Sequence, residues 1–177
     1  MLKFLKETKR IHDNQHGFRE QRSCLSQLLE HHDLILDALE SGGSYDVIYT
    51  DFAKAFDKCD FTVICRKLIK LGIAGNVGRW IHSFLTRRNF RVLVNGKLSE
   101  EEVVVSSVPQ GTILAPLLFV IIISDISDDI ENCDVGTFAD DTKISKCIKS
   151  SEDADCLQSG LNSAFDWADA NNMEFNG

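Results

Sequence analysis

Three aspartates stand at positions where their side chains could do chemistry. Asp51 follows the β-branched and aromatic run 45–50, and Asp140 and Asp141 separate two short apolar runs. If the strands predicted at these runs are neighbours in one sheet, the three carboxylates meet at one edge of it. Two like charges about 4 Å apart repel by about 4 kcal/mol at an effective dielectric of 20, so such a cluster requires protons or cations.

Hard divalent cations suit a cluster of carboxylates, and Mg²⁺ or Mn²⁺ would leave positions open for phosphate oxygens. Two such ions about 3.5–4 Å apart can activate an attacking hydroxyl and neutralise the leaving oxygen of a phosphoryl transfer. Adjacent strand residues point to opposite faces, so we expect Asp140 to be the stronger ligand and Asp141 the weaker one. In the alternative interpretation, Asp140-Asp141 is ordinary turn chemistry and Asp51 is a strand-terminal cap. Spacing alone leaves both interpretations open.

Helical periodicity predicts the elements that surround these aspartates. Helices are expected over 23–39, after Asp60, after Asn76 and from Ser151 to about 171, and the apolar run 113–123 predicts a buried helix. The stripes predicted to be buried are Leu25, Leu28, Leu29, Leu36 and Leu39; Ile64, Leu68 and Leu71; Val77, Trp80, Ile81, Phe84 and Leu85; and Ala154, Leu157, Leu161, Ala164 and Ala168.

Strand signals complete the predicted fold. The run 45–50 predicts a strand that ends at Asp51, and Asn95-Gly96 between apolar runs predicts a hairpin with a type I′ turn. A second hairpin is expected over 135–144, with Asp140-Asp141 at its tip. Strands mixed with helices, without regular alternation, indicate an α+β fold with a mostly antiparallel sheet.

Composition limits the class of protein. The chain has 177 residues, 44% of them apolar and 26% charged, which is typical of one globular domain and excludes a disordered or collagen-like chain. Its net charge of −8 argues against a free-standing nucleic-acid binder, unless acids cluster at a metal site. Six cysteines without a C-x-x-C pair predict a reduced, intracellular protein, in the nucleus or the cytoplasm. No membrane partner is expected, because the run 113–123 is shorter than the roughly 20 residues of a membrane helix.

Five motifs along the chain occur in the order of a known family. They are Gln15-His16-Gly17-Phe18-Arg19, the segment 49–57 (YTDFAKAFD), the segment 108–119 (VPQGTILAPLLF), Phe138-Ala139-Asp140-Asp141-Thr142 and Phe165-Asp166-Trp167. These motifs resemble those of reverse transcriptases, most closely the enzymes of non-LTR retrotransposons. The resemblance extends from about Gln15 to Gly177.

The resemblance implies an RNA-directed DNA polymerase built on a polymerase palm. One domain is expected over 1–177, with partial fingers over about 1–44, a palm over 45–177 and no thumb. Its partners would be an RNA template, a DNA primer and deoxynucleoside triphosphates, together with the missing fingers and thumb segments of a full-length polyprotein.

The resemblance also assigns roles to single residues. Asp51, Asp140 and Asp141 match the catalytic aspartates that bind two Mg²⁺ or Mn²⁺ ions, and the Phe52 carbonyl matches a further ligand. Phe56 matches an aromatic residue under the incoming sugar, where a flat ring leaves no room for a 2′-hydroxyl.

Three further residues match substrate contacts. Gln110 and Gly111 match a loop that lines the nucleotide and template pocket, where glycine permits close approach and glutamine offers donors and acceptors. Arg19 is a candidate contact to template or triphosphate. Each assignment has a structural alternative: Phe56 as core packing, Gln110-Gly111 as an ordinary loop, and Arg19 as a solvated surface charge.

Two other functional hypotheses remain. Because the resemblance lacks the basic fingers and the thumb, we expect a fragment or degenerate copy that is weakly active or inactive alone. Such a chain could instead be a non-catalytic remnant that serves as an interaction or nucleic-acid-binding module. A nucleotide cyclase-like palm is a weaker third hypothesis, because it gives the loop 109–111 no role.

Overall fold

The computed structural model describes residues 4–5, 8 and 10–176, and its centre is a three-stranded antiparallel sheet. The strands are β1 (Ser44–Thr50), β7 (Asp141–Ile148) and β6 (Asp134–Phe138), in the order β1-β7-β6. The condition set for a carboxylate cluster, that the two aspartate-bearing strands are neighbours, is therefore met, and the α+β class is confirmed. The division at residue 44 stays a prediction, and residues 1–3, 6–7, 9 and 177 of the predicted ranges lie outside the described residues.

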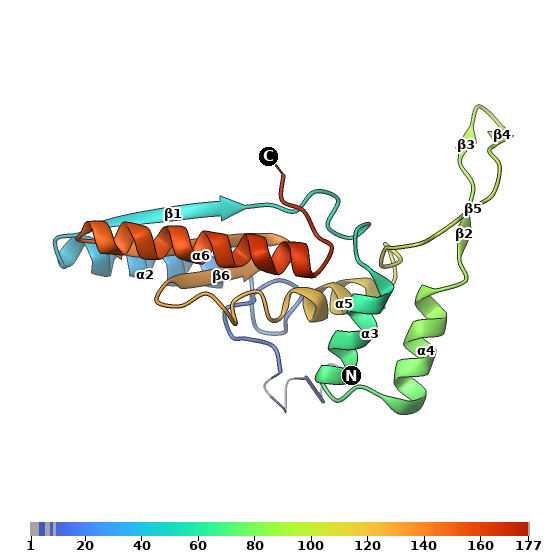
Figure 1. Ribbon diagram of the computed structural model, residues 1–177, viewed down its shortest axis with the longest axis horizontal. Helices are drawn as coiled ribbons and strands as arrows, with labels where there is room; N and C mark the ends of the chain where they lie inside the picture. Colours follow the sequence, from blue (N-terminus) through green and yellow to red (C-terminus); the bar gives the residue numbers. More distant parts are fainter. Residues whose placement is uncertain (1–3, 6–7, 9, 177) are drawn as a thin grey trace.

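Helices cover both faces of this sheet. Helix α6 (Ser151–Ala170) crosses one face and α2 (Cys24–Glu40) lies behind the other (Figure 1). On the α6 side, Ile144 of β7 is fully buried in an apolar cluster with helix residues Leu157 and Ala164. Because side chains alternate along a strand, the opposite face carries the polar and aromatic residues of β1 and β7.

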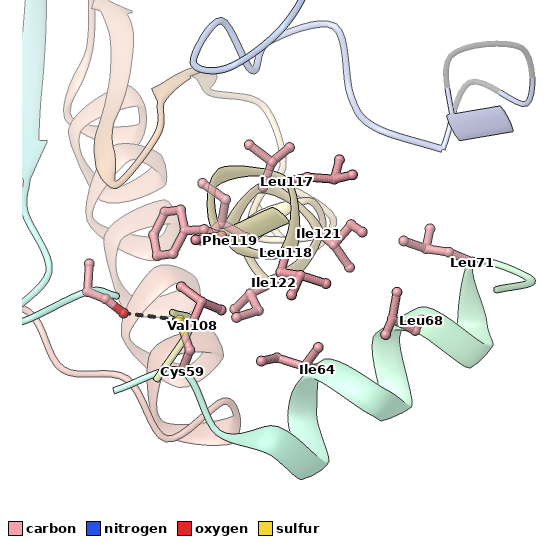
Figure 2. Close-up of a cluster of buried hydrophobic side chains, with 14 of the residues drawn as sticks. Cys59, Ile64, Leu68, Leu71, Val108, Leu117, Leu118, Phe119, Ile121 and Ile122 are labelled. Atoms are coloured by element: carbon pink, nitrogen blue, oxygen red, sulfur yellow. Dashed lines mark hydrogen bonds between the residues drawn. The ribbon is translucent and has the colours of Figure 1, made fainter. Parts of the chain in front are cut away.

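The main hydrophobic core surrounds α5 (Leu114–Ile123), which is buried on nearly all sides. Figure 2 shows three residues of the α3 segment (helix Phe61–Lys70) directed toward it; these are the predicted stripe Ile64, Leu68 and Leu71. Asp60 caps α3 as predicted, because its carboxylate accepts the Thr62 and Val63 amides at 2.7 and 3.1 Å.

Two other predicted stripes are only partly right. In α4 (Gly75–Leu85), Ile81 and Leu85 are buried, but Val77 and Trp80 are 52% and 57% exposed, because α4 contacts the body mainly through α3. In α6, Leu157, Ala164 and Ala168 are buried as predicted, whereas Ala154 is exposed and Leu161 is half-buried; the N-cap is Ser150, one residue before the predicted Ser151.

The stripe predicted for α2 is wrong. Its leucines Leu25, Leu28, Leu29, Leu36 and Leu39 are all exposed. The helix instead turns Gln27, His31 and Leu34 toward β6 and β7, with Ala38 buried. The physical reason is the sheet face beneath α2, where Tyr45 and polar side chains of β7 offer partners for polar groups and few for leucine.

The predicted hairpin after α4 forms a long arm. Its strands are β2 (Asn89–Phe90), β3 (Leu93–Val94), β4 (Lys97–Leu98) and β5 (Glu102–Val103), with β2 paired to β5 and β3 to β4. The turn is confirmed, since Asn95 and Gly96 have φ of 49° and 78°. Figure 1 shows the arm projecting away from the body.

Two expectations from composition can be compared with the structure. All six cysteines are free. Among the helices of the described residues, none is sufficiently long and apolar to cross a lipid bilayer.

Candidate active site

The carboxyl end of β1 lies against the amino end of β7. Thr50, the last residue of β1, pairs with Thr142, and the Thr50 hydroxyl donates to the Thr142 carbonyl at 3.2 Å. Asp51 follows Thr50 and Asp141 precedes Thr142, so both aspartates stand at the same end of the sheet. There the charge of Asp51 acts on the carboxyl of Asp141.

Asp140 reaches the same edge through a tight turn. Strand β6 ends at Phe138 and β7 begins at Asp141, and these two residues pair with each other. The turn therefore consists of Ala139 and Asp140, which moves the predicted tip one residue toward the N-terminus. Ala139 has a φ of 55°, in the left-handed region that non-glycine residues seldom adopt.

The electrostatics of Asp141 reflect this crowding. Partial burial raises the pKa of its carboxyl above the ordinary value, and the charges of Asp140 and Asp51 raise it further. The carboxylate of Asp51 has a second partner, because the Asn176 side-chain amide donates to its Oδ2 at 2.7 Å. The Asn176 backbone amide also donates to the Asp51 carbonyl, at 2.8 Å.

The donor set at this edge fits a hard divalent cation. It consists of carboxylate oxygens without a thiolate or imidazole, and their mutual repulsion would be relieved by bound positive charge. Within residues 4–5, 8 and 10–176, however, no three His, Cys, Asp or Glu side chains are already gathered closely enough to hold a metal ion. Because the Asn176 side-chain amide donates to Asp51, a bound cation would have to share the Asp51 carboxylate with Asn176.

Phe52 anchors the start of the loop after β1. Its side chain is only 2% exposed and stacks on Phe175 with ring centroids 4.3 Å apart, while the Trp167 ring lies 5.9 Å away. The loop and the C-terminal segment are joined by the Ala53 amide, which donates to the Glu174 carbonyl at 2.8 Å. The side chain of Phe52 therefore belongs to the hydrophobic core. The predicted role as a metal ligand concerns its backbone carbonyl only.

The loop that carries Gln110 lies beside the loop that follows Asp51. The Val108 amide donates to the Phe56 carbonyl at 3.0 Å, and the Gln110 side-chain amide donates to Asp57 Oδ1 at 3.1 Å. The half-buried Phe56 ring stacks on Phe119 of α5, with centroids 4.5 Å apart. Gly111 is exposed with a φ of 82°, a conformation that favours glycine.

A family model described as "Reverse transcriptase (RNA-dependent DNA polymerase)" matches residues 1–177. The chain belongs to this family. It is 30% identical over 179 residues to "RNA-directed DNA polymerase from mobile element jockey" of Drosophila melanogaster, covering 96% of this chain and 19% of that protein. It is 31% identical over 120 residues to "Probable RNA-directed DNA polymerase from transposon BS" of the same species, covering 68% of this chain and 13% of that protein.

Solved structures agree with the reverse transcriptase fold. A telomerase from Candida albicans, solved with a fragment of telomeric RNA, matches 99% of this chain and 33% of its own with a TM-score of 0.74. At 13% identity this likeness shows the fold alone. The chain spans about a fifth of the length of its jockey relative.

One predicted contact residue of this reverse transcriptase domain is engaged elsewhere. The Arg19 guanidinium donates to the carbonyls of His12 and Gln15 at 2.6 and 3.2 Å, and it lies 3.3 Å from Asp13 Oδ1. These contacts hold Arg19 to the segment 12–15. They favour a structural role in this conformation, and its contact with template or triphosphate stays a prediction.

Two residues at the carboxylate edge were not found by sequence reasoning. Asn176 binds Asp51, as described above, and Gln15 contacts the backbone of Ala139. Gln15 lies in a motif that carried the family resemblance, so the sequence marked this residue, but it did not indicate that Gln15 contacts Ala139. Asn176 follows Phe175, whose ring packs on Phe52, and only the folded chain brings it to Asp51.

Proposed function

We propose that this chain is the palm, with part of the fingers, of an RNA-directed DNA polymerase from a non-LTR retrotransposon. The observation that supports it best is that the charges of Asp51 and Asp140 both act on Asp141 at one end of the sheet, in a chain of this family. The substrates would be an RNA template, a DNA primer and deoxynucleoside triphosphates.

The proposed chemistry is phosphoryl transfer. The primer 3′-hydroxyl attacks the α-phosphorus of the triphosphate, a new P–O bond forms, the α–β phosphoanhydride breaks and pyrophosphate leaves. Asp51, Asp140, Asp141 and the Phe52 carbonyl would hold two Mg²⁺ or Mn²⁺ ions. These ions would supply the positive charge that activates the hydroxyl and neutralises the leaving oxygen. The protein's own contribution is positioning and charge, without a covalent intermediate.

The remaining contacts would select and orient the nucleotide. Gln110 lies against the loop that contains Phe56, so the two side chains can line one side of the same substrate. Phe56 is held by Phe119 and would exclude a 2′-hydroxyl with the exposed part of its ring. Gly111 would allow close approach of the template, and Arg19 would contact template or triphosphate after release from the segment 12–15.

Mn²⁺ titration tests the proposed metal site without requiring activity. We expect the wild-type chain to bind Mn²⁺, observed by electron paramagnetic resonance of the free ion, and Asp140→Asn to weaken binding about tenfold or more. The matched control is Asp33→Asn on the exposed face of α2, which also removes one negative charge. Equal affinity of Asp140→Asn and Asp33→Asn would contradict the metal site.

One observation favours the alternative of a non-catalytic remnant. Asn176 occupies a carboxylate oxygen of Asp51, and the carboxylates are not gathered into a ligand set in the described part of the chain. A remnant would fold normally but would show no Mn²⁺ binding above the Asp33→Asn level. The same titration therefore separates the two functions.

Net charge predicts the affinity of the chain for nucleic acid and its dependence on salt. With 27 acids against 19 lysines and arginines, we expect weak RNA binding with a shallow dependence on salt. The logarithm of affinity should fall with the logarithm of salt concentration with a slope of about −2, the value for about three phosphate contacts on a single strand. Fluorescence anisotropy of a labelled RNA between 50 and 200 mM salt measures this slope, and a slope beyond about −5 would show an extensive basic track that the composition does not predict.

A further inference from the structure

The turn that carries Asp140 is held by a segment 124 positions earlier in the chain. The Thr137 amide donates to the Asn14 carbonyl at 2.9 Å, and the His16 amide donates to the Thr137 carbonyl at 2.8 Å. Through these bonds, Gln15 forms an isolated parallel β-bridge with Thr137 on the outer edge of β6. The segment thus reaches the hairpin immediately before its turn.

The Gln15 side chain continues this contact into the turn itself. Its Oε1 accepts the Ala139 amide at 3.0 Å and the Gly17 amide at 2.7 Å, and its Nε2 lies 3.5 Å from the Ala139 carbonyl. Gln15 is 2% exposed, so water cannot easily replace these bonds. A buried amide left without its acceptor destabilises the folded state, because no water replaces the lost bond.

The turn needs such a partner because its backbone is strained. Ala139 is 6% exposed and has a φ of 55°, a left-handed conformation that is unfavourable for a non-glycine residue because its Cβ lies too close to the backbone. With its amide unpaired as well, the turn would relax toward another conformation. Asp140 follows Ala139 directly, so its carboxylate would move with the relaxed backbone.

The segment 14–17, which holds the turn, is itself fixed by α2 and by close backbone contact. A Cβ on Gly17 would lie 2.2 Å from the Ala139 nitrogen, so the two backbones touch where only glycine fits. The neighbouring His16 is 2% exposed, and its ring nitrogens pair with Ser26 Oγ at 2.9 Å and Glu30 Oε2 at 3.0 Å. Helix α2 therefore supports the segment that holds the turn.

We propose that Gln15 is a positioning residue, which holds Ala139 in its left-handed conformation and so sets Asp140 beside Asp51 and Asp141 for metal binding. The metal-binding part of this inference rests on the proposed function. Gln15 touches neither metal nor substrate in this role, because it acts through the backbone of the turn.

The test compares variants that separate the hydrogen bond from the packing. Gln15→Met keeps the volume and removes the acceptor, and we expect Mn²⁺ to bind about tenfold more weakly. Ala139→Gly removes the strain, so Gln15→Met combined with Ala139→Gly should recover most of the lost affinity, an effect that simple loss of stability would not produce.

The control is Asn171→Ala, which removes another buried side-chain amide, one that donates to the Trp167 carbonyl at 2.7 Å. A Gln15→Met variant that binds Mn²⁺ as well as Asn171→Ala would overturn the positioning role. Hydrogen exchange of the Ala139 amide provides a readout without metal. We expect its protection to fall at least tenfold in Gln15→Met, and unchanged protection would contradict the proposal that Gln15 holds the turn. Absence of Mn²⁺ binding in the wild-type chain would overturn the proposed metal site and the metal part of this proposal, while hydrogen exchange would still decide whether Gln15 holds the turn.

Discussion

Replacing Lys67 by methionine is expected to lower the free energy of unfolding by about 3–5 kcal/mol, the usual cost of removing one partner from a buried ion pair. Lys67 is 4% exposed, and its ammonium group donates to the Ile122 carbonyl and, at 2.6 Å, to Asp125 Oδ1. It also lies 4.5 Å from the centre of the Trp167 ring. This one side chain joins α3 to the end of α5 and to α6, so its loss leaves the Asp125 carboxylate without its main counter-charge.

The loss of unfolding free energy in Lys67→Met should depend on pH. Burial of Asp125 disfavours its charged form, but the hydrogen bond and charge of Lys67, with the Trp167 indole and the charge of Lys70, hold the pKa of its carboxyl below the ordinary value. A lowered pKa in the folded state contributes stability above the unfolded pKa of about 4, and this stability is lost as pH falls through the folded pKa. We therefore expect the difference between wild type and Lys67→Met to be largest near neutral pH and to narrow below about pH 4.

Lys70→Met is the matched control for this prediction. Lys70 lies on the same helix 3.6 Å from Asp125 Oδ2, but its side chain is 66% exposed. An exposed ion pair contributes about 0–1 kcal/mol, so this variant should unfold nearly as wild type does. Urea denaturation of the two variants between pH 3 and pH 7 measures both effects, and equal losses would show that burial does not distinguish the two lysines.

Replacing Asp51 by asparagine is expected to reduce addition of a single deoxynucleotide at least a thousandfold. This factor corresponds to about 4 kcal/mol in the activation barrier and would reflect loss of a ligand to both proposed ions. Asparagine keeps the size of the side chain and can still pair with Asn176, so folding should be little affected. The variant therefore removes charge at the candidate site without emptying it.

The measurement must allow for weak binding of nucleic acid. We would use single-turnover conditions with Mn²⁺, the chain in large excess, and a labelled RNA template joined to a DNA primer as one hairpin. Asp33→Asn should react at the wild-type rate, because that carboxylate lies on the exposed face of α2. Equal rates for Asp51→Asn and wild type would contradict a role of this carboxylate in catalysis.

Local signals in the sequence were enough to predict most elements near the site. Asp60 before an apolar stripe predicted the start of α3, and Asn95-Gly96 predicted the type I′ turn, because both features act within a few residues. Strands were also predicted on either side of the aspartates, but whether the strand before Asp51 lies next to the strand after Asp140-Asp141 was left as a condition, which the structure meets. The roles of these residues in metal binding stay predictions.

Surface exposure was the part that local patterns predicted poorly. Leu25, Leu29 and Leu36 have the spacing of a buried stripe, yet all are exposed, because the sheet face under α2 presents tyrosine and polar side chains. Trp80 similarly remains exposed because α4 packs mainly on α3. Periodicity gives the faces of a helix, but the neighbour decides which face is covered.

By itself, the sequence determined the family, the α+β class and the three acidic positions, because each depends on motifs or on short-range preferences along the chain. Only the tertiary structure decided that Asp51 shares a hydrogen bond with Asn176 and that Gln15 holds the Ala139 turn. Both contacts join residues more than a hundred positions apart, and no local pattern encodes which distant backbone amide or carboxylate a buried side chain will meet. That choice is made by packing of the whole chain, which satisfies buried polar groups wherever the fold brings them together.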